Sequence, residues 1–407
     1  MAELRATPTN ASSRAPGAVE ATSPCALVTG GGSGGHVFPG LAVAHELESR
    51  GWRVSWAGGR KGMERRLVTD RGLEYHALEA RPLLGRGAVQ KGMALANLAV
   101  SACRARGLLR RLGAQVVLGT GGFVSAPAAV GARFAGVPLL LLEPNAEPGL
   151  ANRMLSRLAA EAAIAHDATA ARLRCPSKVT GVPVRAEFFA VDPELPPMPP
   201  LRILVLGGSQ GARQLNELLP AALAGLPDSL GHVEVLHQAG ERHLDATAAA
   251  YATAGPRVAV ASESPGGGES RQGGPATIEV RPTPFLDDVA AAMAESHLVV
   301  SRAGAITLAE LCAAGRPSLL VPLAIAGGHQ RSNAESLARA GAAAVLPTAA
   351  EADELGRMLA ALLGDRQELA AMAARARSLG RADAAGAIAD RVEHWNRAPA
   401  PGRGEVS

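Results

Sequence analysis

The sequence predicts an α/β protein of two Rossmann-like domains, each with a parallel sheet, that face each other across a cleft. First, an apolar strand, a glycine-rich turn and an apolar helix occur in this order at residues 25–47 and again at 201–223. Second, further apolar strands alternate with helical segments after each opening. Third, a chain of 407 residues exceeds the length at which a single hydrophobic core stops growing, so two domains are expected.

Each half contributes its own expected strands. They are 25–29, 53–57, 116–119 and 139–142 in the first half, and 201–206, 233–238, 277–281, 298–301, 318–321 and 343–346 in the second. Five prolines at 191–200 predict a stiff linker. We therefore expect a disordered tail at 1–23, a first domain at 24–190, a linker at 191–200, a second domain at 201–380, a last helix at 381–397 and a disordered tail at 398–407.

Composition limits the classes of partner. The formal net charge of +4 suits an anionic ligand or a membrane surface and is too small to indicate nucleic acid. Residues 1–23 lack the apolar core of a secretory signal, and the most apolar run, 137–142, is far shorter than the roughly 18 residues of a membrane-spanning helix. The four cysteines form no recognisable disulfide framework, which fits a reducing cytoplasm. Any membrane contact is expected to be peripheral.

The first glycine-rich turn contains Gly30-x-Gly32-x-x-Gly35, a spacing that lets a backbone turn approach a pyrophosphate at a helix start. A nicotinamide site would also need an acidic residue after the second strand, and the segment that follows Trp56 has none. His36 comes next to the turn, at the carboxyl end of a strand, where α/β proteins place their active sites, so we interpret it as a general base. The alternatives are a tight turn without a ligand and a structural histidine.

In the second half, residues 301–310 indicate a strand end, a small-residue turn and a new helix, which leaves free backbone N–H groups from about Ala305 onward. Those groups would hold a diphosphate. Glu310, one turn farther along the helix, could accept both hydroxyls of a ribose, or else only complement the helix dipole. Arg185 and Ser209 could complete the phosphate cradle. There is no Asp-x-Asp motif or metal-ligand spacing, so no metal and no other cofactor is expected.

Several stretches, in the same order along the chain, resemble the MurG family of N-acetylglucosaminyltransferases. They are 31–44, 121–125, 181–185, 207–212, 302–310 and 328–334. The family transfers N-acetylglucosamine from UDP-GlcNAc to undecaprenyl-pyrophosphoryl-MurNAc-pentapeptide, with inversion at the anomeric carbon and no covalent intermediate. The resemblance implies a GT-B fold, with the donor bound mainly by the second domain, the acceptor by the first, and the last helix crossing back to the first domain.

The resemblance also implies roles for individual residues. His36 would be the base that deprotonates the acceptor's 4-hydroxyl. The donor-side residues would be Ser33, Gly34, Gly35, Asn145, Arg185, Ser209, Leu286, Ala305, Ile306, Thr307, Leu308, Ala309, Glu310 and Gln330. Within that set, Leu286 would line the uracil, Glu310 would bind the ribose and Gln330 the sugar hydroxyls, while Arg185, Ser209 and the residues from Ala305 to Thr307 would meet the phosphates.

On the acceptor side, the resemblance points to Phe123, Ser125 and Glu143. The chain departs from the family pattern here. Phe123 stands where tyrosine is common and cannot give a hydroxyl to the acceptor, while Leu142 and Pro144 interrupt a stretch that is usually His-Glu-Gln-Asn. The polar insertion at 262–274 is expected to be a surface loop without chemistry.

Residues 81–111 combine apolar side chains with seven basic residues and no acidic one, a composition suited to anionic headgroups and a lipid tail. We expect this segment to attach the protein to the cytoplasmic face of the inner membrane, the alternative being an ordinary amphipathic helix. Two other functions remain open. A UDP-N-acetylglucosamine 2-epimerase would share the fold and the donor, and a non-catalytic sugar-nucleotide sensor would keep Arg185 and Glu310 without needing His36.

Overall fold

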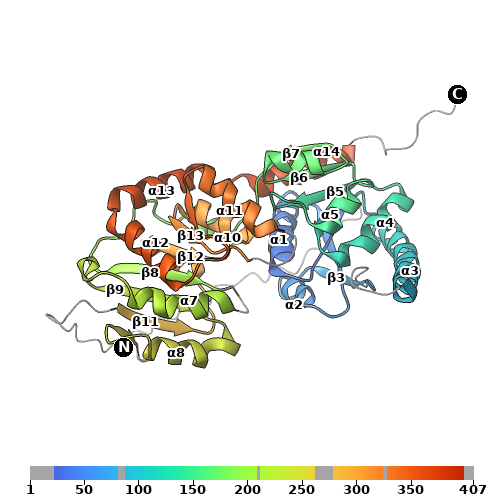
Figure 1. Ribbon diagram of the computed structural model, residues 1–407. Coiled ribbons are helices and arrows are strands. Elements are labelled where there is room, and N and C mark those ends of the chain that lie inside the picture. The colour runs from blue at the N-terminus through green and yellow to red at the C-terminus, as the bar shows by residue number, and fades with distance from the viewer. Residues whose placement is uncertain (1–22, 81–87, 209–210, 262–277, 324–327, 398–407) are drawn as a thin grey trace, which may run out of the picture.

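The computed structural model describes residues 23–80, 88–208, 211–261, 278–323 and 328–397. Two α/β domains lie next to each other, and each is built on one sheet of parallel strands with helices on both faces (Figure 1). The expected tails, the insertion at 262–274 and Ser209 lie outside the described residues. The α/β class with two Rossmann-like sheets is confirmed.

The first sheet has seven strands in the order β3-β2-β1-β4-β5-β6-β7. Along the chain they are β1 (Cys25–Gly30), β2 (Arg53–Gly58), β3 (Glu74–Ala77), β4 (Val116–Gly121), β5 (Leu139–Glu143), β6 (Glu161–Ile164) and β7 (Ser177–Val179). The helices are α1 (Gly34–Ser49), α2 (Met63–Thr69), α3 (Ala88–Leu112), α4 (Ala126–Ala135) and α5 (Leu150–Leu155), with short 3-10 turns η1 (Phe123–Ser125) and η2 (Asp167–Arg172). The strand order changes direction between β1 and β4, so the crevice at their carboxyl ends is where such sheets bind ligands.

The second sheet repeats this plan in the order β10-β11-β9-β8-β12-β13-β14. Its strands are β8 (Leu201–Leu206), β9 (Val233–Gln238), β10 (Val258–Val260), β11 (Ile278–Thr283), β12 (Leu298–Ser301), β13 (Ser318–Leu320) and β14 (Ala343–Val345). The helices are α6 (Ala186–Phe189), α7 (Arg213–Ala224), α8 (Leu244–Ala252), α9 (Val289–Ala294), α10 (Ala305–Ala314), α11 (His329–Arg339), α12 (Ala352–Gly364) and α13 (Arg366–Leu379), with 3-10 turns η3 (Asp228–Leu230) and η4 (Glu241–His243). Here the order changes direction between β8 and β12.

The strands that the sequence analysis missed are β3, β6, β7 and β10. Three of them, β3, β7 and β10, are edge strands, β6 is next to an edge, and all four are three or four residues long. Two of them lack an apolar run, since β3 is Glu-Tyr-His-Ala and β7 is Ser-Lys-Val, and the apolar runs of β6 and β10 are only three residues long. Such short strands are defined by pairing with a neighbour, which a local pattern does not report.

The last helix, α14 (Ala384–Arg397), packs on the first domain (Figure 1). Its Ile388 and Val392 are fully buried in the core that also contains β1 and α1. Arg391 donates two hydrogen bonds to Glu161 at 2.6 and 2.7 Å, and the Trp395 indole donates a third at 3.0 Å. The end of the chain is therefore part of the domain in which the chain begins.

The proline-rich segment at 191–200 is fixed to the second domain and does not form a free spacer. The carbonyl of Asp192 accepts a hydrogen bond from the buried Arg316 guanidinium at 2.8 Å. The carbonyl of Pro196 accepts one from His297 Nε2 at 2.9 Å, while His297 Nδ1 accepts from the Arg202 amide. Since His297 both donates and accepts, its neutral form fits this position, and burial lowers its pKa.

Candidate active site

The glycine-rich turn after β1 holds His36 in the first turn of α1. His36 Nδ1 lies 3.0 Å from the carbonyl oxygen of Gly31 and 3.2 Å from Ser33 Oγ. A carbonyl oxygen can only accept a hydrogen bond, so Nδ1 must carry the proton in the neutral ring. Nε2 is then left with a free lone pair, as a general base requires.

The turn after β4 packs against the same histidine. A Cβ at Gly121 would lie 2.9 Å from His36 Cδ2, and one at Gly122 would lie 2.4 Å from the Gly31 carbonyl oxygen. Both glycines also have positive φ, at +105° and +78°. Glycine is therefore required at both positions, by conformation and by space. The imidazole is enclosed by backbone on this side.

Two of the three expected acceptor residues do not face solvent. Ser125 is fully buried, and its hydroxyl donates a hydrogen bond to the Gly122 carbonyl at 2.7 Å, so it orders the turn. Glu143 is 1% exposed. Both of its oxygens are occupied: Oε1 accepts from Asn145, and Oε2 accepts from the Gly149 amide and Asn152 Nδ2. The polar atoms of Ser125 and Glu143 thus have partners within the protein, and their direct contact with an acceptor stays a prediction, whereas Phe123 is 45% exposed and available.

In the second domain, the start of α10 presents unpaired amides, as expected. The N-cap is Gly304, which has no side chain to cap the helix, and the first intrahelical bond runs from the Leu308 amide to the Gly304 carbonyl. The N–H groups of residues 305–307 are therefore free for an anion. Leu308 does not fit the expected donor contacts as well, because its amide is already bonded and its side chain is 3% exposed within the core.

Glu310 and Arg185 lie together beside this helix start. Arg185 Nη2 is 3.9 Å from Glu310 Oε1, and Arg185 Nη1 is 2.8 Å from Glu187. Burial raises the pKa of Glu310 to about 7, although the charge of Arg185 opposes the rise. Arg185 is 44% exposed at its side chain, so it can also reach a ligand. A cation, a row of free amides and a carboxylate next to each other suit a nucleoside diphosphate.

Two further donor-side residues, Leu286 and Gln330, lie on separate segments of the second domain. Leu286 lies just before α9 and is partly buried against the core that contains α10. Gln330 Oε1, in the first turn of α11, accepts a hydrogen bond from the Leu323 amide at 2.9 Å. Among the described residues, the side-chain NH₂ group of Gln330 has no hydrogen-bond partner, so it could bind a hydroxyl.

The two halves of the site meet at a buried asparagine of α11. Asn333, fully buried, donates hydrogen bonds to Asn145 Oδ1 at 3.1 Å and to the Ala303 carbonyl at 3.2 Å, and accepts the Ala146 amide at 2.9 Å. It therefore joins the loop after β5 to the turn before α10. His329 adds a bond to the Glu147 carbonyl at 2.7 Å. Consistently, α1 and α10 approach each other across the domain boundary (Figure 1).

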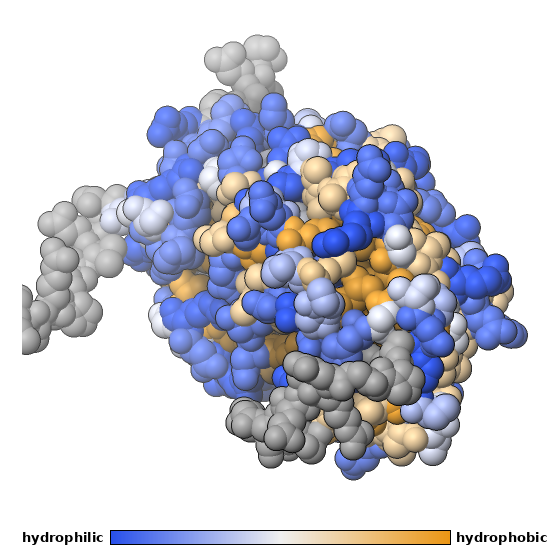
Figure 2. All heavy atoms as spheres, turned by 90° about the vertical axis from the view of Figure 1, so that its left-hand side faces the viewer, coloured by the Kyte–Doolittle hydropathy of each residue, from blue (hydrophilic) through white to orange (hydrophobic). Residues whose placement is uncertain are grey.

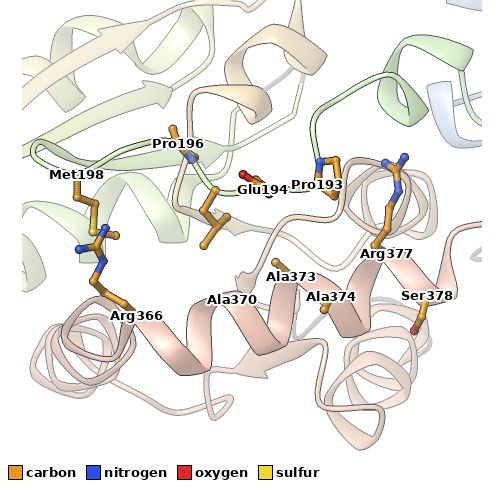
Figure 3. A pocket seen from close by; sticks show the side chains of 11 residues that line it. Pro193, Glu194, Pro196, Met198, Arg366, Ala370, Ala373, Ala374, Arg377 and Ser378 are labelled. Carbon is orange, nitrogen blue, oxygen red and sulfur yellow. The ribbon is translucent and has the colours of Figure 1, made fainter.

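A groove on the described surface lies apart from this arrangement. It has a volume of about 700 Å³ and lies between the linker and α13, with Arg366 and Arg377 toward its two ends (Figure 3). Viewed from the second-domain end, the molecule shows hydrophobic residues at the centre of its face, surrounded by hydrophilic ones (Figure 2). None of the candidate site residues lines this groove.

Comparison with known proteins identifies the family. The N-terminal domain model of glycosyltransferase family 28 matches residues 26–164, and the C-terminal domain model of the same family matches 202–388. The chain belongs to glycosyltransferase family 28. A protein of Ectopseudomonas mendocina named UDP-N-acetylglucosamine–N-acetylmuramyl-(pentapeptide) pyrophosphoryl-undecaprenol N-acetylglucosamine transferase is 42% identical over 369 residues, which cover 89% of this chain and 96% of that protein.

Solved structures of glycosyltransferases agree with this family. The crystal structure of Acinetobacter baumannii MurG has 32% sequence identity and a TM-score of 0.73, over 91% of this chain and 99% of that one. This likeness confirms the GT-B fold. The structure of a putative UDP-N-acetylglucosamine 2-epimerase from Listeria monocytogenes, at 14% identity and a TM-score of 0.61, shares only the fold. Membership of family 28 therefore favours the transferase over the epimerase and over the non-catalytic sensor.

Three polar residues that the sequence analysis did not assign help to build this family 28 site. Asn333 joins the two domains, Asn152 holds Glu143, and Glu64 lies under the first glycine-rich turn. Asn333 fell within a recognised stretch, but nothing in the sequence signals that its amide reaches the other domain. In the described part of the chain, no group of three or more His, Cys, Asp or Glu could hold a metal ion, and no helix is long and apolar enough to span a bilayer.

Proposed function

We propose that this family 28 enzyme transfers N-acetylglucosamine from UDP-GlcNAc to the 4-hydroxyl of undecaprenyl-pyrophosphoryl-MurNAc-pentapeptide. Relatives that are 42% identical to this chain carry names that specify these substrates, which supports the proposal. The observation that carries the proposal is the approach of α1, which bears His36, to α10, whose free amides begin the nucleotide site. A base for the incoming alcohol and a cradle for the leaving diphosphate thus belong to opposite domains at one boundary.

The reaction is a single in-line displacement. The acceptor's 4-hydroxyl gives its proton to His36 Nε2 while its oxygen attacks the anomeric carbon, and the bond from that carbon to UDP breaks. The amides of residues 305–307 and the Arg185 guanidinium stabilise the negative charge that develops on the diphosphate. Loss of one such donor costs about 3 kcal/mol in comparable sites. We propose that the reaction requires no divalent metal, and transfer in excess chelator should continue; complete inhibition that magnesium reverses would contradict this.

The division of labour between His36 and Glu310 is the test of the proposal. His36→Ala should abolish transfer of labelled sugar to a synthetic lipid-linked muramyl acceptor while UDP binding, measured by calorimetry, is retained. Glu310→Ala should weaken UDP binding in a folded protein. Equal losses of both properties in both variants would refute these roles, and formation of the 2-epimer from UDP-GlcNAc without any acceptor would support the epimerase.

We propose that α3 and α4 attach the enzyme to an anionic membrane surface. On α3, the side chains of Met93 and Val100 are 56% and 53% exposed, and Arg104 and Arg111 follow at helical spacing on the same face. Phe134 at the end of α4 is 62% exposed, and its carbonyl accepts a bond from Arg106. Exposed apolar groups beside arginines suit a headgroup layer.

Vesicle sedimentation tests this attachment. The enzyme should bind vesicles with anionic lipids, more weakly at high salt, and Met93→Ser combined with Phe134→Ser should reduce binding with soluble-substrate activity intact. Leu379→Ser, at an exposed position of α13 in the other domain, is the matched control. Equal vesicle binding by the double variant and the control would contradict the assignment.

A further inference from the structure

A buried carboxylate lies beneath the glycine-rich turn that carries His36. Glu64, in the first turn of α2, is 1% exposed. Its Oε1 accepts the Gly59 amide at 3.3 Å, and its Oε2 accepts the Gly32 amide at 3.3 Å. Arg66, two residues farther along α2, pairs with Asp70. Glu64 is thus held by backbone N–H groups, and the chemistry described so far does not use it.

The surrounding glycines provide the space for this carboxylate. A Cβ at Gly31 would lie 2.6 Å from Glu64 Cδ, and a Cβ at Gly62 would lie 2.3 Å from Glu64 Oε2. Side chains do not tolerate such distances. Glycine at positions 31 and 62 therefore makes room for the Glu64 side chain, whether or not a nucleotide binds.

The hydrogen bonds of one peptide group connect Glu64 to His36. The N–H of the Gly31–Gly32 peptide belongs to Gly32 and donates to Glu64, while the C=O of the same peptide belongs to Gly31 and accepts from His36 Nδ1 at 3.0 Å. In a trans peptide these two groups point in opposite directions. The carboxylate, the peptide and the imidazole consequently form one continuous chain, in which each bond polarises the next.

We propose that Glu64 is a positioning residue that acts on His36 through the Gly31–Gly32 peptide. By fixing and polarising this peptide, Glu64 holds the imidazole in the tautomer with Nδ1 protonated and leaves Nε2 free for the acceptor's proton. The peptide takes the place that a directly bonded carboxylate has beside many catalytic histidines. The inference rests on the proposed function only in treating His36 as the base.

A tyrosine also binds the turn that contains Gly59. Tyr75 donates a hydrogen bond to the Gly59 carbonyl at 2.6 Å, on the other side of the same turn. Burial, and after it the negative charge of Glu64, raises the pKa of Tyr75, while Arg65 opposes the rise. No histidine contributes to this effect.

The experiment is ¹⁵N NMR of the histidine side chains in the full-length protein, with His36 assigned from the signal lost in His36→Asn. The wild type should show the neutral Nδ1–H tautomer, which a free imidazole in water disfavours. Glu64→Gln places an NH₂ donor against an amide, so the Nε2–H tautomer should become populated and kcat should fall roughly ten- to hundredfold, with a smaller change in donor KM. Glu64→Asp, whose oxygens no longer reach both amides, replaces Glu64→Gln if the latter does not fold.

Glu161→Gln is the matched control, because Glu161 is also a buried carboxylate of the first domain. It accepts hydrogen bonds from Arg391 and Trp395 and lies on β6, three strands away from β1 in the sheet. Glu161→Gln should lower stability and leave the His36 tautomer unchanged. An Nε2–H tautomer in the wild type, or a folded Glu64 variant with the wild-type tautomer and kcat, would overturn the proposal. A tautomer that shifts while kcat stays constant would uphold the chain of bonds and instead refute His36 as the base.

Discussion

Glu310 should make the free enzyme less stable as the pH rises. Its pKa is raised from 4.5 to about 7, first because it is buried. The folded protein therefore keeps a proton that the unfolded chain releases, and the free energy of unfolding falls between about pH 4.5 and 7 and is constant above. The rise corresponds to about 3 kcal/mol, an upper value because 16% of the side chain is exposed.

The perturbation that isolates this effect is Glu310→Gln, which keeps the shape of the side chain and removes its ionisation. Urea unfolding at a series of pH values from 5 to 8 should give curves that coincide at low pH and diverge by up to about 3 kcal/mol at pH 8, with the variant more stable. Glu335→Gln, at an exposed carboxylate of α11, should not diverge from the wild type in this way. Parallel curves for wild type and Glu310→Gln would refute the reasoning.

The same carboxylate should have the opposite effect on ligand binding. An ionised Glu310 can accept both ribose hydroxyls, whereas the protonated form can accept fewer hydrogen bonds. UDP affinity of the wild type should thus increase as the pH rises through about 7, and the Gln variant should bind weakly at every pH. Calorimetric titration gives this profile directly. A variant that gains stability and loses affinity would show that the site is built at a cost in stability.

Three further substitutions test the contacts around the site. Asn333→Ala leaves the Ala146 amide unpaired, so urea unfolding should show a loss of about 1–3 kcal/mol, and donor KM should rise. Gly122→Ala pushes a Cβ against the Gly31 carbonyl, which should lower kcat by roughly a hundredfold in the transfer assay. Arg391→Ala removes the cation from the buried Glu161, at a loss of about 3 kcal/mol in unfolding free energy at neutral pH.

The Arg391 prediction also has a pH dependence. Although burial opposes its ionisation, the hydrogen bonds from Arg391 and Trp395 hold the pKa of Glu161 below its usual value of 4.5. The stabilisation is therefore present above about pH 4.5 and lost as the pH falls, so wild type and Arg391→Ala should converge in acid. A constant difference between wild type and Arg391→Ala would contradict this pH dependence. An unchanged donor KM would contradict the prediction for Asn333→Ala, and a wild-type kcat would contradict the one for Gly122→Ala.

Much of the fold was predictable because its signals are local. The apolar strands β1, β8, β9 and β12 were predicted within a residue of their ends, and each begins with a continuous apolar or alternating run. The turns that follow β1 and precede α10 were recognised by their small residues. Because parallel sheets place such turns at a common edge, their position at the two switch points followed from the pattern.

The sequence does not report which polar atoms the folded chain itself occupies, even where the partner is only a few residues away. Glu143 and Ser125 were expected to face an acceptor, yet Asn152 and the Gly122 carbonyl occupy their polar atoms inside the domain. Leu308 was expected in the donor site together with the residues next to it in the helix, although its side chain is buried in the core. Local sequence gives the type of a side chain but not the side of the backbone on which its partners lie.

The sequence by itself determined the α/β class, the two repeated openings, the family, and His36, Arg185 and Glu310 as candidates, since these depend on local pattern and residue chemistry. Only the tertiary structure decided that Asn333 reaches the first domain and that Glu64 contacts His36 through a shared peptide. These contacts join residues that are far apart in the chain, or they act through backbone atoms that no side-chain pattern reports. Their partners are fixed by how the two sheets pack, which no short stretch of sequence encodes.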